Sequence, residues 1–187
     1  MNKAEAGELV MGESTHSRRV RLFSALLTKE SGLGTNGIVV VGGSAIEIYT
    51  EGDYVSEDLD LIVSSRGRIL EVLKNWGFEN EGKIWSNASW KIFVDAMEGD
   101  LSGSRRLTRV ISTSVGPLCI SGVEDLIIRR IRESVAWQGR EEAFAQAVLL
   151  HRHNSSDLDW DYIRFFARRE GWERQLGELR SMAGLTK

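Results

Sequence analysis

Residues 37–63 read GIVVVGGSAIEIYTEGDYVSEDLDLIV, and this stretch decides the fold. It opens with a run of β-branched residues, which predicts a short buried strand. Gly42 and Gly43 then break the run, and apolar residues resume at helical spacing from Ala45 onward. A second apolar run follows at residues 59–63. The stretch therefore predicts a strand, a tight glycine turn, a helix and a second strand.

The flanking sequence predicts further elements from its apolar spacing and turn residues. These are a helix over residues 14–30, a helix over residues 66–77, a hairpin with its turn across residues 86–89, and short strands near residues 109–113 and 117–121. Beyond them the pattern becomes helical, and Ser121 and Glu124 have the spacing of a capping box. We therefore expect an α/β (α+β) domain at residues 1–118 and a helical C-terminal module at residues 119–187.

The composition indicates a chain that can bury a substantial core, since 42% of its 187 residues are hydrophobic. The single cysteine, Cys119, excludes an internal disulfide and a cysteine-based zinc site, and we expect it to be buried. The N-terminus lacks the apolar core of a signal peptide, and no segment approaches the roughly 20 apolar residues that span a bilayer. A soluble cytoplasmic protein without a membrane partner is expected.

Charge is divided unevenly along the chain. Residues 1–100 carry 10 of the 24 Lys+Arg and 16 of the 27 Asp+Glu, which leaves 14 and 11 for residues 101–187. All the later cations except Lys187 are arginines, which can grip a phosphate with two parallel hydrogen bonds. This asymmetry suggests an anionic partner. The alternative is that the arginines lie on solvated helix faces and pair with neighbouring glutamates.

Two carboxylates, Asp58 and Asp60, are candidate metal ligands. They lie two apart on an extended segment, so their side chains share one face while Leu59 and Leu61 point into a core. Like charges so close repel each other, and paired carboxylates supply the hard oxygen ligands that Mg²⁺ takes. The alternative is an acidic pair on a solvated loop.

The glycine turn is a candidate phosphate site. Gly42, Gly43 and Ser44 lie where a strand is predicted to meet a helix. Glycine permits close approach there, and the helix N-terminus presents unpaired N–H groups. In this interpretation Ser44 adds a hydroxyl donor. The alternative is a turn that serves only tight packing, with Ser44 as an ordinary N-cap.

A third carboxylate, Asp95, lies in WKIFVDAM, which otherwise predicts a core strand. An unpaired charge inside such a strand is costly, so we expect it to have a partner. If this strand lies beside the strand of Asp60, then Asp95 joins Asp58 and Asp60 as ligands for one or two metal ions. The alternative is a strand-end Asp95 that faces water, with Glu98 or Asp100 as the third ligand.

Together these motifs resemble the signature of the nucleotidyltransferase superfamily with the DNA polymerase β-like fold. The resemblance rests on V-G-G-S, S-E-D-L-D-L-I-V and the later F-V-D. More closely, residues 38–179 resemble the minimal nucleotidyltransferases typified by AbiEii, the toxin of type IV toxin–antitoxin systems. The fold implied is a mixed sheet with flanking helices, followed by a helical module. The site residues implied are Asp58, Asp60 and Asp95 for metal and catalysis, and Gly42, Gly43, Ser44 and Ser56 for the nucleotide.

The helical module resembles the same family less completely. Residues 122–126 match its P-E-D-L-hydrophobic segment. Where the family commonly has a lysine the chain offers Arg130, and Ala145 stands in place of the second acid of a K-D-x-x-D stretch. Arg129, Arg130 and Arg140 are the arginines that we expect to contact the nucleotide or an anionic acceptor.

The resemblance implies transfer of a nucleoside monophosphate from an NTP to an acceptor hydroxyl. The acceptor is RNA, a protein or a small molecule, the cofactor is Mg²⁺ or Mn²⁺, and a cognate antitoxin protein is a further possible partner. Two alternatives stay open, and the departure at Ala145 favours the first of them. One is a non-catalytic nucleotide-binding or regulatory protein on the same fold. The other is an interaction domain whose acids are surface residues.

Overall fold

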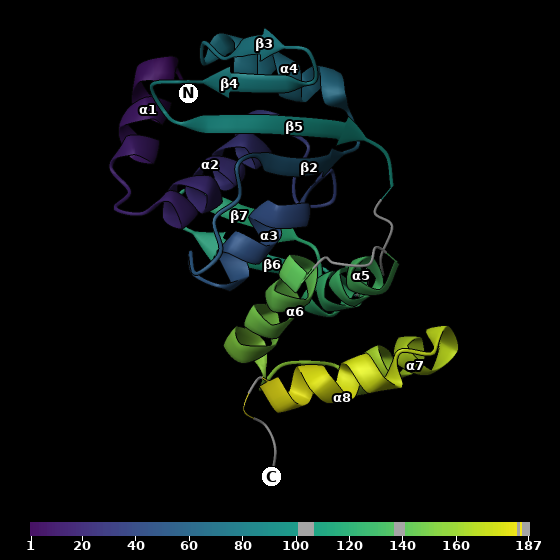
Figure 1. Cartoon of the computed structure of the whole chain (residues 1–187). Helices are drawn as coiled ribbons and strands as arrows, with labels where there is room; N and C mark the ends of the chain where they lie inside the picture. The colour runs from purple at the N-terminus through teal and green to yellow at the C-terminus, as the bar shows by residue number, and fades with distance from the viewer. Residues whose placement is uncertain (101–106, 137–140, 183, 185–187) are drawn as a thin grey trace. The chain divides into compact units, whose positions relative to one another are not determined.

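The computed structural model describes residues 1–100, 107–136, 141–182 and 184, which form two compact units, Met1–Ser121 and Gly122–Lys187. In the first unit, helices are interspersed with strands up to α4, and the rest of the unit's described elements are strands (Figure 1). They are α1 (Lys3–Met11), α2 (His16–Glu30), β1 (Ile38–Val40), α3 (Gly42–Tyr49), β2 (Leu59–Val63), α4 (Arg66–Asn75), β3 (Glu79–Glu81), β4 (Ile84–Asn87), β5 (Ile92–Glu98), β6 (Arg109–Thr113) and β7 (Gly116–Ile120).

The strands form one mixed sheet in the order β3-β4-β5-β2-β1-β7-β6. Strands β2 and β5 run parallel, as do β1 and β7, and the remaining neighbours are antiparallel. The expected α/β class with a mixed sheet and flanking helices is therefore confirmed. The parallel pair β2–β5 matters most for function, because its register decides which side chains lie next to each other.

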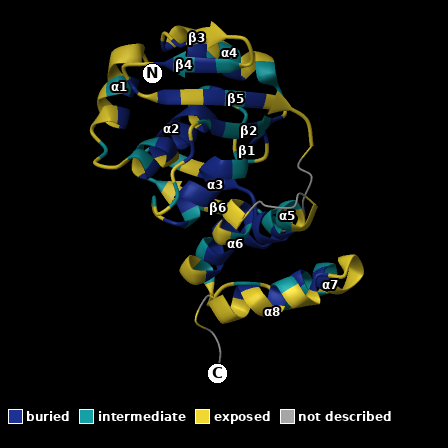
Figure 2. Cartoon of the chain, in the orientation of Figure 1, coloured by how far each residue is buried: buried dark blue, intermediate teal, exposed yellow. Residues whose placement is uncertain are grey.

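The two faces of the sheet differ in burial (Figure 2). On one face Leu61 and Val94 are fully buried, and α2 and α4 contact the strands. Aromatic residues near these helices extend this core, with Phe23 of α2 packing on Trp76 at 5.7 Å between ring centroids. On the opposite face Phe93 is 44% exposed, as expected for alternate residues of a strand that faces solvent.

The second unit consists of helices in its described part: α5 (Val123–Ala136), α6 (Glu141–Asn154), α7 (Trp160–Glu170) and α8 (Glu173–Met182). The predicted capping box at the start of α5 is not formed. The Ser121 hydroxyl has no hydrogen-bond partner in the part of the chain that the structure describes. Glu124 is buried and accepts instead from the Asp159 amide at 3.0 Å. Here a tertiary hydrogen bond replaces the local one that the spacing predicts.

One domain boundary and one helix also differ from the expectation. The predicted division after residue 118 falls inside β7, which pairs with β1 and extends to Ile120, so the helical unit begins at Gly122. Helix α1 is not predicted, although Asn2 and Glu5 form a capping box that starts it.

Among the described residues, no helix combines the length and apolar character needed to cross a membrane.

Candidate active site

The register between β2 and β5 brings two of the candidate carboxylates together. Asp60 pairs with Asp95, and the strands run parallel, so both side chains project from the same face of the sheet. Asp58 directly precedes β2, two residues before Asp60. All three are half-buried, whereas Leu59 on the other face is buried. The expectation that the strand of Asp95 lies beside that of Asp60 is confirmed.

The glycine turn at the start of α3 packs directly against these acids. Gly42 has φ 61°, a left-handed conformation that side-chain-bearing residues rarely adopt. A Cβ added there would overlap the Asp60 carboxylate, whose Cγ would lie 2.8 Å away. A Cβ at Gly43 would lie 2.5 Å from Ser56 Oγ, and the Gly43 amide donates to Asp60 Oδ2 at 3.2 Å. The turn therefore requires glycine because the acidic segment lies against it.

Ser44 has a different role from the two that the sequence suggests. Its buried hydroxyl donates to the Asp58 carbonyl at 2.8 Å and accepts from the Asp60 amide at 2.9 Å. The hydroxyl hydrogen is thus used within the protein, which corrects the expectation that it is offered to a phosphate. Ser44 is not the N-cap either, since α3 is preceded by Val41, which makes no side-chain cap. Only its amide, near the helix start, is left as a donor to a phosphate.

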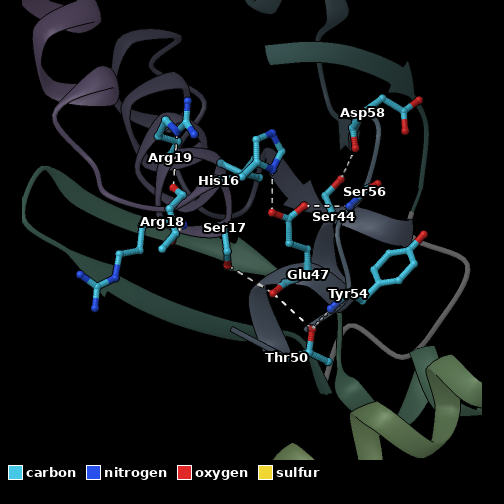
Figure 3. A network of polar contacts seen from close by, with 12 residues as sticks. His16, Ser17, Arg18, Arg19, Ser44, Glu47, Thr50, Tyr54, Ser56 and Asp58 are labelled. Atoms are coloured by element: carbon cyan, nitrogen blue, oxygen red, sulfur yellow. Dashed lines mark hydrogen bonds and ion pairs between the residues drawn. The ribbon is translucent and has the colours of Figure 1, made fainter. Parts of the chain in front are cut away.

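A buried glutamate that the sequence analysis missed lies one turn further along α3. Glu47 has a fully buried side chain, and Figure 3 shows its carboxylate between two partners. Glu47 Oε1 lies 2.7 Å from His16 Nδ1, and Oε2 accepts from the Ser56 amide at 2.9 Å. An acid within the apolar run A-I-E-I was the available signal, because a buried carboxylate needs partners.

The contact with Glu47 changes the titration of His16. Its hydrogen bond to Glu47 raises the pKa of His16 above the ordinary value, and burial opposes this effect. A raised folded-state pKa means that the folded protein binds the proton more tightly than the unfolded chain. This contribution to stability is complete below the unfolded pKa and is lost as the pH rises through the folded pKa.

We therefore expect wild type to be more stable than the variant His16→Gln at low pH, with the difference shrinking as the pH rises. The difference should be largest below about pH 6.5, the ordinary pKa of histidine. Urea unfolding of both proteins at intervals from about pH 5.5 to about pH 8.5 measures it. A difference that grows with pH contradicts this sign.

Glu98, one of the alternative third ligands, is less well placed than Asp95. Glu98 Oε2 accepts from the Arg66 amide at 2.9 Å, where α4 begins. Glu98 and Asp95 are three apart on β5, so they point to opposite faces. In the described part of the chain, no three His, Cys, Asp or Glu side chains are gathered as a metal site. Backbone register thus brings Asp60 and Asp95 together, while the side chains of the three acids do not converge as placed.

Two of the predicted arginines, Arg129 and Arg130, lie on α5. Arg129 Nε contacts Glu133 at 3.1 Å, and the Arg130 guanidinium pairs with the same carboxylate on the next turn of α5. Their hydrogen bonds to Glu133 hold the pKa of that carboxyl below its ordinary value against the opposing effect of burial. Arg140 lies outside the described residues. A contact between these arginines and a nucleotide or acceptor stays a prediction.

Comparison with known proteins agrees with the fold. No protein-family profile and no curated protein sequence matches the chain. Among solved structures, the chain is similar to the antibiotic-resistance factor ANT(2'')-Ia, whose solution structure shows substrate-regulated conformation dynamics. The TM-score is 0.52 and the sequence identity 11%, over 89% of this chain and 97% of the other. The chain therefore shares the fold of that protein, with its mixed sheet and flanking helices.

Proposed function

We propose that this protein is a metal-dependent nucleotidyltransferase that moves a nucleoside monophosphate from an NTP to an acceptor hydroxyl. The observation that carries the proposal is the β2–β5 register, which sets Asp95 beside Asp60. Asp58 lies two residues before Asp60, and the glycine turn of α3 packs against Asp60. Likeness to ANT(2'')-Ia supports the same reading at the level of the fold.

The donor set fits a hard divalent cation. Asp58, Asp60 and Asp95 offer carboxylate oxygens, which are the ligands that Mg²⁺ and Mn²⁺ prefer. When bound, the metal neutralises phosphate charge and lowers the pKa of an attacking hydroxyl. The chain itself supplies the remaining parts. The Gly42 and Gly43 backbone permits close approach of a phosphate at the start of α3, where the helix dipole favours negative charge.

The first test is nucleotide binding with and without a divalent cation. We expect ATP, GTP, CTP or UTP to bind at least about tenfold more tightly with Mg²⁺ or Mn²⁺ than with EDTA, because triphosphate and carboxylates repel each other without a bridging cation. Isothermal titration calorimetry of each NTP measures the two affinities. Equal affinities in EDTA and in Mg²⁺ contradict the proposal.

A second test finds the acceptor. Each NTP, labelled on its α-phosphate, is incubated with the protein, Mg²⁺ and separated RNA, protein and small-molecule fractions of a cell extract. Transfer of a nucleoside monophosphate carries the α-phosphate label onto one of these fractions and releases pyrophosphate. Label in the RNA, protein or small-molecule fraction identifies the acceptor class.

The finer assignments rest on the motif resemblance alone. A role as the toxin of a toxin–antitoxin pair, with a cognate antitoxin protein, is a proposal from the resemblance of residues 38–179 to AbiEii. The departure at Ala145 favours a second candidate, a nucleotide-binding regulatory protein that does not turn over. Ala145 is exposed on α6 and has no carboxylate to offer. Metal-dependent NTP binding without label transfer in the acceptor experiment distinguishes this candidate.

A further inference from the structure

Side chains of α3 form hydrogen bonds with backbone groups of residues 56–60, the segment that carries Asp58 and Asp60. Ser44 Oγ donates to the Asp58 carbonyl and accepts from the Asp60 amide. One turn later, the Glu47 carboxylate accepts from the Ser56 amide at 2.9 Å. Ser44 and Glu47 are three apart on the helix, so they present their side chains on neighbouring turns of one face. Figure 3 shows both reaching toward the 56–58 segment.

We propose that Glu47 is a positioning residue, whose buried carboxylate fixes residues 56–58 against α3 and thereby fixes the direction in which Asp58 offers its carboxylate to the metal. This inference rests on the proposed function. Glu47 accepts a hydrogen bond from the Ser56 amide, two residues before Asp58, so it acts on Asp58 through the backbone. Ser44 holds the carbonyl of Asp58 itself.

The geometry explains why the residue is a carboxylate. Two N–H donors, from the Ser56 amide and from His16 Nδ1, point at Glu47. An ionised carboxylate has only acceptors, so each of its oxygens serves one donor and His16 carries a hydrogen on Nδ1. Burying the carboxylate would be costly alone, and His16 on α2 supplies the charge-assisted partner. Helix α2 thus supports the hydrogen bonds by which Ser44 and Glu47 hold residues 56–60 against α3, and we call this set of bonds the clasp.

The surroundings of Glu47 hold it in one place. Its own backbone carbonyl accepts from the Ser17 hydroxyl at 3.3 Å and from the Gly52 amide at 3.0 Å. The groups that act on His16 are Glu47 on α3, Arg19 on its own helix, which opposes protonation, and the Lys91 backbone. The clasp is therefore tied to α2, to α3 and to the loop after α3. Several bonds that fix one side chain are expected where that side chain must keep a metal ligand in a fixed orientation.

The variant Glu47→Gln tests the role because it keeps the volume and replaces one acceptor by a donor. The Gln carbonyl can serve either Ser56 or His16, and its NH₂ group then faces the other N–H donor. A neutral His16 can shift its hydrogen to Nε2 and accept from this NH₂ group, whereas a protonated His16 cannot. The variant should therefore keep the clasp at high pH and lose it at low pH.

The experiment measures Mn²⁺ binding in the presence of a non-hydrolysable NTP analogue, by the EPR signal of free Mn²⁺, at about pH 8 and about pH 6. We expect Glu47→Gln to bind within about twofold of wild type at the higher pH and about threefold to fourfold more weakly at the lower pH, because a histidine with the ordinary pKa of about 6.5 is about three-quarters protonated at about pH 6. The control is Glu57→Gln, an exposed residue of the same segment that loses the same charge. Its ratio to wild type should be equal at both pH values.

The outcomes separate the two proposals. If wild type does not bind Mn²⁺ with the analogue, the proposed function fails. If wild type binds and Glu47→Gln follows Glu57→Gln at both pH values, the positioning role alone is overturned. If Glu47→Gln does not fold, hydrogen exchange of the Ser56 amide in wild type, measured by NMR, tests the positioning role instead. Saturating Mg²⁺ and analogue should slow exchange of the Ser56 amide at least about threefold, by reciprocity of coupled sites. An unchanged rate overturns the positioning role.

Discussion

The variant Asp58→Asn is expected to lower nucleotidyl transfer by about a hundred- to a thousandfold, while the metal-free protein keeps its stability. The expectation follows from the place of the side chain. Only the Asp58 backbone carbonyl is used within the fold, by Ser44, and the described residues provide no hydrogen bond or ion pair to its carboxylate. Asparagine keeps the shape and removes the charge, so the fold loses no contact.

Stability measurements test this prediction directly. Relative to wild type, the variant should have an equal or higher unfolding free energy without metal and a lower one with Mg²⁺ and NTP. Without metal, Asp58→Asn should unfold within about 0.5 kcal/mol of wild type or be more stable, since one of three like charges is gone. With Mg²⁺ and NTP at about 100 times the dissociation constant, wild type gains about 2.7 kcal/mol by mass action, and the variant should gain almost none.

Thermal melts of both proteins, each with and without Mg²⁺ and NTP, measure the two effects. The exposed neighbour Glu57→Gln is the matched control and should keep the full ligand-induced shift. A variant that melts lower than wild type without metal, and yet gains the full shift with ligand, would show that Asp58 has a structural role and binds no metal.

Local sequence sufficed to predict the parts of the site that lie close along the chain. Gly42, Gly43 and the acids of β2 are separated by one short helix and a turn, so the pattern of apolar and turn residues places them together. Asp95 required one assumption, that its strand pairs with β2. A charge within a core-like strand supported that assumption, and the observed register confirmed it.

The remaining parts depend on tertiary contacts that no local pattern carries. His16 and Glu47 are 31 positions apart, and only the packing of α2 on α3 makes them partners. Ser44 is a residue type that often caps helices and lies near the start of α3, yet its hydroxyl forms hydrogen bonds with the acidic segment. The turn residue Gly42 adopts a left-handed conformation, so that Val41 precedes the helix and Ser44 enters its first turn.

These contacts show how the site is built as a unit. Asp60 accepts from the Gly43 amide, Asp58 is held through Ser44, and Ser56 is held through Glu47. Every one of these bonds links α3 to the acidic segment. A change in the glycine turn should therefore reach the acids without passing through the hydrophobic core.

The variant Gly42→Ala tests this connection, and we expect it to abolish metal-dependent NTP binding at a small cost in stability. Two effects act at this position. The left-handed backbone strains any residue with a Cβ by about 1–2 kcal/mol. In addition the new methyl group overlaps the Asp60 carboxylate, with Cγ only 2.8 Å away. A carboxylate is the end of a flexible side chain, so it rotates away, and the metal loses a ligand.

Gly34→Ala is the matched control, because it shares the strain without the overlap. Gly34 has φ 65°, close to the 61° of Gly42, and a Cβ added there meets nothing within 4 Å. Both variants should lose about 1–2 kcal/mol of unfolding free energy. Only Gly42→Ala should lose Mn²⁺ binding in the presence of NTP. Urea unfolding and Mn²⁺ titration of the two proteins measure both quantities. Wild-type Mn²⁺ affinity in a folded Gly42→Ala protein would mean that Asp60 does not bind the metal from its place beside the turn.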